Sequence, residues 1–310
     1  LADFYNSKNK SKYHVIELSS FQLESAPTFN SYISILLNIS NDHLERYKKI
    51  KNYIFQKQKI FNGKKNSFNI IAIDDQYCRA IFDTYKKINF IPISINKKVK
   101  KSIYVEDNNI IDNYFFKNKR IPIINISKSL YGKLNLQNIL SAYAVSIILN
   151  INLSTFLLAL KSFKGLNHRH EIFYKKNNKT FINDSKATTF EASKFALKSN
   201  KNIFWIVGGL PKLGDEFKIN KVKKNITKAY IIGNYPKYFK KYLNGKINFE
   251  LSGSLNSAII SIFRDIKNIN EKKITILLSP ASASYDQFRN FEERGNKYKK
   301  LIIKYAKRNF

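Results

Sequence analysis

The hydrophobic positions of the chain form short apolar runs that alternate with longer segments of helical period. Short apolar runs are typical of buried strands, and apolar residues spaced three or four apart are typical of amphipathic helices. The alternation predicts an α/β fold with mostly parallel sheets. In the first half it predicts strands near residues 14–18, 32–39, 69–73 and 89–95, hairpin strands within 102–126, and helices near 48–61, 76–87, 136–149 and 153–163.

A polar segment, GLNHRHE at residues 165–171, interrupts this pattern after the helix that Gly165 is expected to end. Strand-length runs then resume at 181–184, 202–209, 229–233 and 274–280, and helices are expected from 190, around Tyr238, over 255–266 and from 288 to the end of the chain. The pattern therefore predicts two α/β domains, residues 1–166 and residues 167–310.

The composition is strongly basic, with a formal net charge of +33 from 55 Lys and Arg against 22 Asp and Glu. Such charge is a feature of nucleic-acid-binding proteins. Here, however, the lysines are spread along the whole chain among many Asn, Ile, Phe and Tyr residues, and they form no basic stripe. We therefore expect solvated lysines, no nucleic-acid partner, and a surface field that attracts small anions.

A single cysteine, Cys78, excludes an internal disulfide framework and fits a reducing compartment. No run approaches the ~18 apolar residues of a membrane-spanning helix, and the first residues do not resemble a signal peptide. The sequence predicts a cytoplasmic protein without a membrane partner. The chain contains no Met and opens on Leu1, so we expect that it has lost its natural start.

Three candidates in the first half have ordinary interpretations when taken alone. Glu17, in ELSSFQLE, is expected at a strand end, where it could be a carboxylate favoured by a helix N-terminus or, with Ser19, a metal ligand. His43, in NISNDHLER, could form a capping and packing pair with Asp42 or bind a metal. Lys57 is one lysine among many on a predicted helix.

Three polar loops in the second half each follow an expected strand. They are NDSKAT at 183–188, VGGLPKLGD at 207–215 and SPASASYDQFRNFEERG at 279–295. Their small residues let backbone N–H groups approach a ligand, and their cations favour a negative one. Together the loops predict a site for an anionic small molecule.

These segments, with KQKIF at 57–61 and GKLNLQN at 132–138, resemble the Mur ligase family, in its branch that adds D-glutamate to UDP-N-acetylmuramoyl-L-alanine. The resemblance runs from about residue 10 to the C-terminus. It implies a truncated central ATPase-type α/β domain followed by a C-terminal Rossmann-like α/β domain. It also implies a cytoplasmic, monomeric enzyme of peptidoglycan precursor synthesis that uses ATP and Mg²⁺.

The implied reaction begins when ATP phosphorylates the substrate carboxylate to an acyl phosphate, which the amine of D-glutamate then attacks. The resemblance implies Mg²⁺ ligands at Glu17, Ser19, His43 and a Lys57 carbamylated by CO₂, because a carbamate oxygen suits a hard cation. It implies catalytic roles for Lys57, His43 and Lys186. It implies ATP contacts at Asn135, Asn138, Arg169 and Asp184, and a D-glutamate site formed by Lys186, Thr188, Lys212, Ser284 and Phe291.

The sequence departs from the family in lacking the glycine-rich phosphate loop and the N-terminal domain that precedes it, on the order of 100 residues. We therefore expect this chain alone to have little or no ligase activity. Other interpretations stay open. They are a folylpolyglutamate-type or later Mur ligase, a non-catalytic nucleotide-binding relative, and, on charge alone, a nucleic-acid-binding protein.

Overall fold

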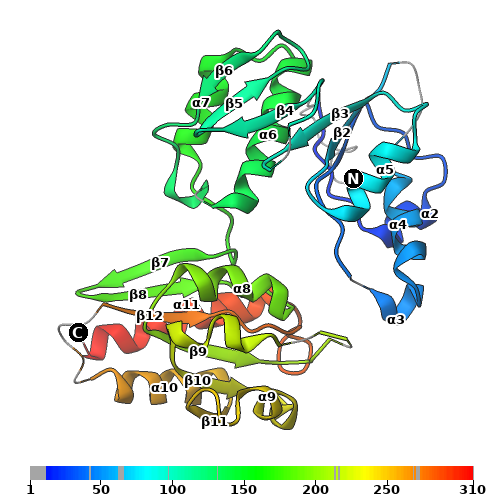
Figure 1. The fold of residues 1–310 in the computed structure, drawn as a ribbon. Helices are drawn as coiled ribbons and strands as arrows, with labels where there is room; N and C mark the ends of the chain where they lie inside the picture. The colour runs from blue at the N-terminus through cyan, green and yellow to red at the C-terminus, as the bar shows by residue number, and fades with distance from the viewer. Residues whose placement is uncertain are drawn as a thin grey trace. The chain divides into compact units, whose positions relative to one another are not determined.

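The computed structural model describes residues 12–309 apart from Asp42, 62–65, Lys97, Tyr131, Leu213, Glu216, Asn268 and 270–272. The chain divides into two compact units, Leu1–Phe163 and Lys164–Phe310. Within the described residues each unit contains one six-stranded sheet with helices packed on it (Figure 1). The expected mixed α/β fold with mostly parallel sheets is confirmed.

The sheet of the first unit runs β1-β2-β3-β4-β5-β6. The first four strands pair in parallel, and β5 and β6 add an antiparallel meander, which confirms the expected hairpin strands. The strands are β1 (Ile33–Leu36), β2 (Phe68–Ala72), β3 (Phe90–Ser94), β4 (Ile103–Glu106), β5 (Asn109–Asp112) and β6 (Lys119–Pro122).

Helices cover this sheet over two apolar clusters. One cluster packs Ile70 and Ile93 against Tyr143, and the other packs Ile71 against Tyr53 and Cys78. The helices are α2 (Ser20–Ser25), α3 (Leu44–Tyr47), α4 (Ile50–Gln58), α5 (Gln76–Thr84), the 3-10 turn η1 (Lys128–Leu130), α6 (Lys133–Ile148) and α7 (Leu153–Ser162).

The expected strand at residues 14–18 is wrong, because residues 13–19 lie in no strand or helix. The side chain of Val15 is fully exposed, at 102%. A strand persists only where its backbone N–H and C=O groups pair with a neighbour, and no described segment pairs with these residues. The apolar run alone was therefore not enough to make a strand.

The sheet of the second unit runs β11-β10-β9-β12-β8-β7, with only β7 antiparallel to its neighbour among the described strands. The strands are β7 (Glu171–Lys176), β8 (Lys179–Asn183), β9 (Ile203–Gly208), β10 (Ile226–Ile232), β11 (Phe249–Gly253) and β12 (Ile274–Leu278). The helices are α8 (Phe190–Ser199), η2 (Ile219–Lys221), η3 (Lys223–Asn225), α9 (Pro236–Leu243), α10 (Leu255–Asp265) and α11 (Phe291–Asn309).

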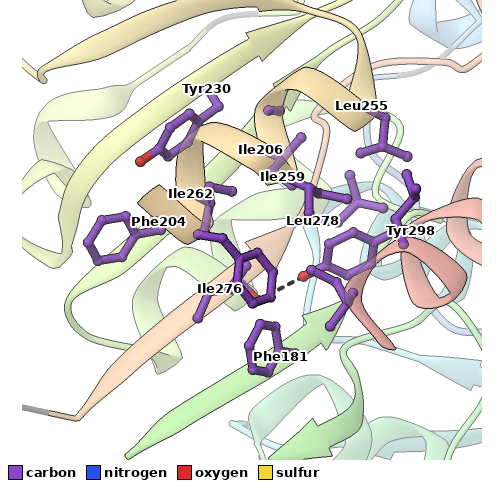
Figure 2. Packing of buried hydrophobic residues seen from close by; sticks show 14 of the residues in the cluster. Phe181, Phe204, Ile206, Tyr230, Leu255, Ile259, Ile262, Ile276, Leu278 and Tyr298 are labelled. Carbon is purple, nitrogen blue, oxygen red and sulfur yellow. Dashed lines mark hydrogen bonds between the residues drawn. The ribbon is translucent and has the colours of Figure 1, made fainter. Parts of the chain in front are cut away.

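The central strands of this sheet are buried on both faces. On one face, side chains from β9, β10 and β12 pack against α10 and α11, and the buried Tyr298 hydroxyl donates to the carbonyl oxygen of Ile276 at 3.1 Å (Figure 2). On the other face Trp205, Phe190 and Phe239 form the second cluster. The two clusters fix the strands and so fix the loops that leave their ends.

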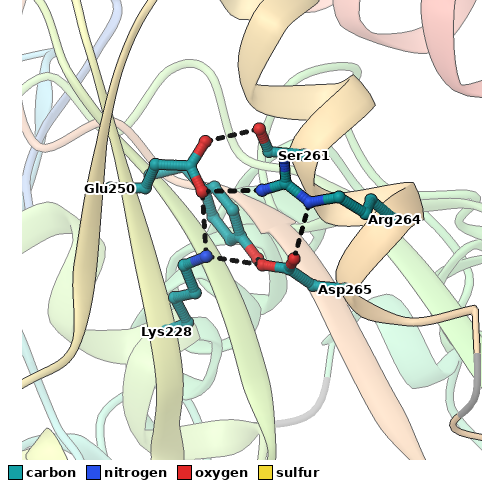
Figure 3. Close-up of polar contacts among 6 residues, drawn as sticks. Lys228, Glu250, Ser261, Arg264 and Asp265 are labelled. Carbon is teal, nitrogen blue, oxygen red and sulfur yellow. Dashed lines mark hydrogen bonds and ion pairs between the residues drawn. The ribbon is translucent and has the colours of Figure 1, made fainter.

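A polar network lies toward the amino ends of β10 and β11 (Figure 3). The Lys228 ammonium lies 2.9 Å from Glu250 and 2.6 Å from Asp265, and Arg264 contacts both carboxylates. The Tyr230 hydroxyl donates to Asp265 at 2.7 Å. Because strand-end loops leave the opposite edge of the sheet, this network belongs to the structure of the sheet and not to those loops.

Candidate active site

Three polar loops meet at the carboxyl edge of the second sheet. They follow β8, β12 and β9, which are parallel neighbours in that order. The loop after β9 pairs with the loop after β12, because Leu210 and Ala283 exchange backbone hydrogen bonds of 2.9 and 3.1 Å. In open α/β sheets this edge is where ligands bind. The sequence-predicted loops are therefore brought together.

Lys186 and Phe291 are in direct contact at this edge. The Lys186 ammonium lies 4.0 Å from the centroid of the Phe291 ring. The buried Ser185 hydroxyl donates to the Phe291 carbonyl at 2.8 Å, so the start of α11 is tied to the loop after β8. A half-buried ammonium held over an aromatic face is presented to an anion from one side. Residues from two distant segments thus form one cationic surface.

The other predicted D-glutamate residues occupy the same three loops. Ser284 is 2% exposed, and its carbonyl accepts from the amides of Gln287 and Phe288 in the turn toward α11. Thr188 is half-buried just before α8, and Lys212 is half-buried in the loop after β9. All of them lie in loops that leave the carboxyl edge of the sheet.

Asp184 is the most strongly perturbed acid of this edge. Its carboxylate accepts from the Ser279 hydroxyl at 2.7 Å and from the His170 amide at 3.0 Å. Burial raises the pKa of Asp184 to about 6, although these two hydrogen bonds and the nearby Arg169 guanidinium each lower it. A carboxyl shifted by desolvation at a strand end is typical of functional sites. Arg169 is exposed beside it.

Sequence reasoning missed the polar cluster formed by the segment GLNHRHE. Asn183 donates to Glu171 at 3.0 Å and lies 2.9 Å from Nδ1 of His168, and Lys299 donates to Glu171 at 2.8 Å. Burial lowers the pKa of His168. A Cβ atom at Gly295 would meet Nδ1 of His168 at 2.2 Å, so glycine is required there. Residues 168–171 are therefore held against the end of β8 and against α11 of the second unit.

In the first unit, Asn135 and Asn138 lie on the first turns of α6. The Asn135 side chain donates to the Ser129 carbonyl at 3.2 Å, and Asn138 donates to the Asn135 side chain at 3.2 Å. Gln137, the residue before Asn138, donates from its side-chain amide to the carboxylate of Asp74, which follows β2, at 2.8 Å. Both asparagines are thus presented beside the carboxyl edge of the first sheet.

The four predicted metal ligands are only partly brought together. The His43 ring packs against Phe21 of α2, with centroids 4.8 Å apart, and lies 6.0 Å from the Tyr53 ring of α4. Glu17 is exposed two residues before the cap of α2. Lys57 lies in the last turn of α4, and its charge lowers the pKa of the buried Cys78 thiol, which burial raises overall.

Ser19 has a structural role in this arrangement. Its hydroxyl accepts from the Gln22 amide at 3.2 Å, and the Gln22 side chain accepts from the Ser19 amide at 2.9 Å, which is a capping box at α2. In the described part of the chain no group of three or more His, Cys, Asp or Glu side chains could hold a metal ion. Of the four predicted ligands only Glu17 and His43 belong to these residue types, and an unmodified Lys57 ammonium would repel Mg²⁺. Asp42, the expected partner of His43, lies outside the described residues.

Comparison with known proteins shows the family to which the chain belongs. Residues 2–146 match the Mur ligase middle domain. The chain is 37% identical over 308 residues to the UDP-N-acetylmuramoylalanine–D-glutamate ligase of Rickettsia prowazekii, covering 98% of this chain and 67% of that protein. It is 38% identical over 292 residues to the enzyme of that name in Rickettsia felis, covering 93% and 64%. The chain thus spans about two thirds of the length of these relatives.

Solved structures support the fold. MurF of Acinetobacter baumannii superposes with a TM-score of 0.63 at 14% identity, covering 88% of this chain and 60% of that chain. MurC of Thermotoga maritima superposes with a TM-score of 0.60 at 18% identity, covering 94% and 62%. The chain thus shares its fold with these two structures over most of its length. The chain belongs to the Mur ligase family, and within it to the UDP-N-acetylmuramoylalanine–D-glutamate ligases.

None of the described helices combines the length and the apolar content needed to cross a membrane.

Proposed function

We propose that this chain carries the central and amino-acid-binding parts of an ATP-dependent ligase that joins D-glutamate to UDP-N-acetylmuramoyl-L-alanine. The observation that carries this proposal is the contact of Lys186 with Phe291, 4.0 Å from ammonium to ring centroid, at the sheet edge where the loop of the buried Ser284 also begins. The edge therefore carries a cation together with residues that have hydroxyl groups. Such donors suit the carboxylates of glutamate.

In this proposal D-glutamate binds among the three loops of the second unit. Lys186 and Lys212 supply ammonium groups, and Thr188 and Ser284 supply hydroxyls for the two carboxylates. Phe291 supports Lys186 through its ring and lies against the ligand. The amine of D-glutamate is thereby oriented toward the acyl group that it attacks, which lowers the entropic part of the barrier.

The nucleotide would be bound by Asn135 and Asn138 at the adenine and by Arg169 and Asp184 at the phosphates and ribose. ATP transfers its terminal phosphoryl group to the carboxylate of the UDP-linked substrate, which gives an acyl phosphate. The D-glutamate amine attacks the acyl carbon and loses a proton, and phosphate leaves from the tetrahedral intermediate. In this proposal the Lys186 ammonium offsets negative charge in that step.

Mg²⁺ is part of the proposal through Glu17, Ser19, His43 and Lys57. Since an unmodified ammonium would repel Mg²⁺, we assign Lys57 a carbamate, which would supply oxygen ligands instead. A bound Mg²⁺ would offset phosphate charge. We also propose that the enzyme is a cytoplasmic monomer that acts only on small molecules. Size-exclusion chromatography with light scattering measures the mass of the particle in solution, and a mass above that of one chain would contradict the monomer.

The test is calorimetric binding of D-glutamate to the purified chain, with L-glutamate and a diamino acid as competitors. We expect D-glutamate to bind and the others to bind at least ~10-fold more weakly. Lys186→Met should abolish measurable binding, whereas Lys198→Met, on the exposed face of α8, should not. Equal affinity for L-glutamate would overturn the substrate assignment, and steeply salt-dependent DNA binding would favour the nucleic-acid alternative.

A further inference from the structure

Arg294, in the first turn of α11, is almost completely buried, at 1% exposure. Its Nε donates to the Ser185 hydroxyl at 3.0 Å, and its Nη2 donates to the Ser185 carbonyl at 2.9 Å and to the Ser282 carbonyl at 3.0 Å. Ser185 belongs to the loop after β8 and Ser282 to the loop after β12. One guanidinium therefore bridges the two loops that carry Lys186 and Ser284.

The third loop closes on the same guanidinium. Gly209, after β9, has a φ of +134°, and a Cβ atom there would lie 2.3 Å from the Ala283 carbonyl and 3.2 Å from Nη1 of Arg294. The absence of a side chain at Gly209 lets the loop approach this closely. All three strand-end loops of the candidate site are thus packed around Arg294.

The charge of Arg294 is not neutralised by a contact. Its printed hydrogen bonds go to uncharged groups of Ser185 and Ser282, and its Nη1 has no hydrogen-bond partner among the described residues. Burial lowers the pKa of Arg294 to about 9, although the negative charge of Asp286 raises it in part. At neutral pH the group still carries its charge. A buried, unneutralised cation at this edge adds to the field that a negative ligand experiences.

We propose that Arg294 is a positioning residue of the D-glutamate site, which holds the Lys186 loop and the Ser284 loop at a fixed separation and places a positive charge behind them. This inference rests on the proposed function. It differs from a purely structural role in one respect. Arg294→Met removes the donor of the buried Ser185 and Ser282 carbonyls and so lowers stability. It also removes the positive charge behind the loops, so ligand affinity should fall further than the loss of stability alone explains.

The experiment compares Arg294→Met, Arg294→Lys and the control Arg264→Met, which removes an exposed arginine at the far edge of the sheet. Hydrogen exchange without ligand should accelerate ~10-fold or more at residues 184–188 and 281–285 in Arg294→Met only. D-glutamate affinity should fall ~10-fold or more in Arg294→Met. Arg294→Lys should recover part of the slow hydrogen exchange and part of the D-glutamate affinity, because lysine keeps the positive charge but lacks the planar guanidinium that donates to both loops.

If Arg294→Met does not fold, Ser185→Ala decides the matter, since it removes the Nε and Phe291 bonds alone and should accelerate exchange in the same two loops. Unchanged exchange and affinity in the folded variants would overturn the inference. If the wild-type chain bound no D-glutamate, the proposed function would fall, while the exchange data would still decide whether Arg294 orders the loops.

Discussion

Gln137 and Asp74 are joined by a hydrogen bond of 2.8 Å that links the start of α6 to the loop after β2. The Asp74 carboxylate also accepts from the Ser94 hydroxyl at 2.6 Å and from the amides of Ile95 and Asn96 at 3.1 Å. Two strand ends and one helix start are therefore held by one carboxylate. The helix start carries Asn135 and Asn138, the proposed adenine contacts.

Asp74→Asn should weaken this junction, because an amide offers one acceptor oxygen where a carboxylate offers two. We expect a loss of about 1–3 kcal/mol in the free energy of unfolding. ATP affinity, measured by fluorescence with a nucleotide analogue, should fall as well. Asp83→Asn, which removes an exposed helix carboxylate paired with Arg79, is the matched control. A variant with normal ATP affinity would show that the junction does not position α6.

Phe291→Leu should weaken D-glutamate binding because Lys186 loses its aromatic support. A cation on an exposed aromatic face gains about 0.5–1 kcal/mol, which corresponds to ~2–5-fold in affinity. Calorimetry measures the change. Phe288→Leu, in the same segment but packed on the core below, should affect the melting temperature more than the affinity. If Phe288→Leu lowered the D-glutamate affinity more than Phe291→Leu did, the ligand would lie nearer Phe288.

Asp184 predicts a pH dependence of stability. Its folded-state pKa of about 6 lies above its ordinary value of 3.8, so the folded protein holds this proton more tightly than the unfolded chain does. Its contribution is therefore most favourable below about pH 4 and is lost as the pH rises through about 6. Relative to Asp184→Asn, the wild type should lose roughly 2–3 kcal/mol of unfolding free energy between pH 4 and pH 7.

Urea unfolding of both proteins across this pH range measures the difference directly, since the titration of all other groups cancels to first order. A difference that stays constant with pH would mean that Asp184 is not desolvated. A difference that grows in favour of the wild type at high pH would mean that its hydrogen bonds from Ser279 and His170 outweigh its burial.

The network at Lys228 should affect stability without affecting ligand binding. Lys228→Met removes the less exposed of the two cations that contact both the Glu250 and the Asp265 carboxylate, and it leaves only Arg264 between them. Because Lys228 is about a quarter exposed, solvent and salt screen part of the effect, and we expect a loss of ~1 kcal/mol at low salt that shrinks at high salt. Lys237→Met, an exposed lysine on α9, is the control. If Lys228→Met changed the D-glutamate affinity, the network at the amino edge of the sheet would not be independent of the candidate site at the carboxyl edge.

The sequence predicted most of the second unit because its strands are buried on both faces and appear as continuous apolar runs. The edge strands β7 and β11 were missed for the same reason, since their residues are mostly half-buried or exposed and form no such run. Residues 14–18 show the opposite error. Their apolar run resembles a strand, but strand formation depends on a pairing partner that a local pattern does not specify.

The candidate site was predictable where its residues lie in contiguous loops, as in NDSKAT. The bonds that organise the site were not predictable. Arg294 and Ser185 are 109 positions apart, and Asp74 and Gln137 are 63 apart. Nothing in the local pattern around either residue indicates its partner, because a buried polar side chain is satisfied by whatever the fold brings beside it.

Lys57 predicts a coupling between CO₂ and the metal. It lies in the last turn of α4, where the helix dipole favours a cation by about 0.3–1 kcal/mol and so disfavours a carbamate anion. A divalent cation nearby would reverse this preference. We therefore expect ¹³C-bicarbonate to give a weak carbamate signal in NMR spectra of the chain alone and a stronger one when Mg²⁺ is added.

Chelation should return the carbamate signal to its weak level, and Lys57→Ala should remove it in both conditions. Lys59→Ala, two residues further along, should leave the signal unchanged, since this exposed lysine contacts the Phe55 ring and is not among the proposed ligands. His43→Ala should keep the weak signal but remove its response to Mg²⁺, because the cation would then lose one of its ligands. A carbamate signal of equal strength with and without Mg²⁺ would show that modification of Lys57 does not depend on the metal.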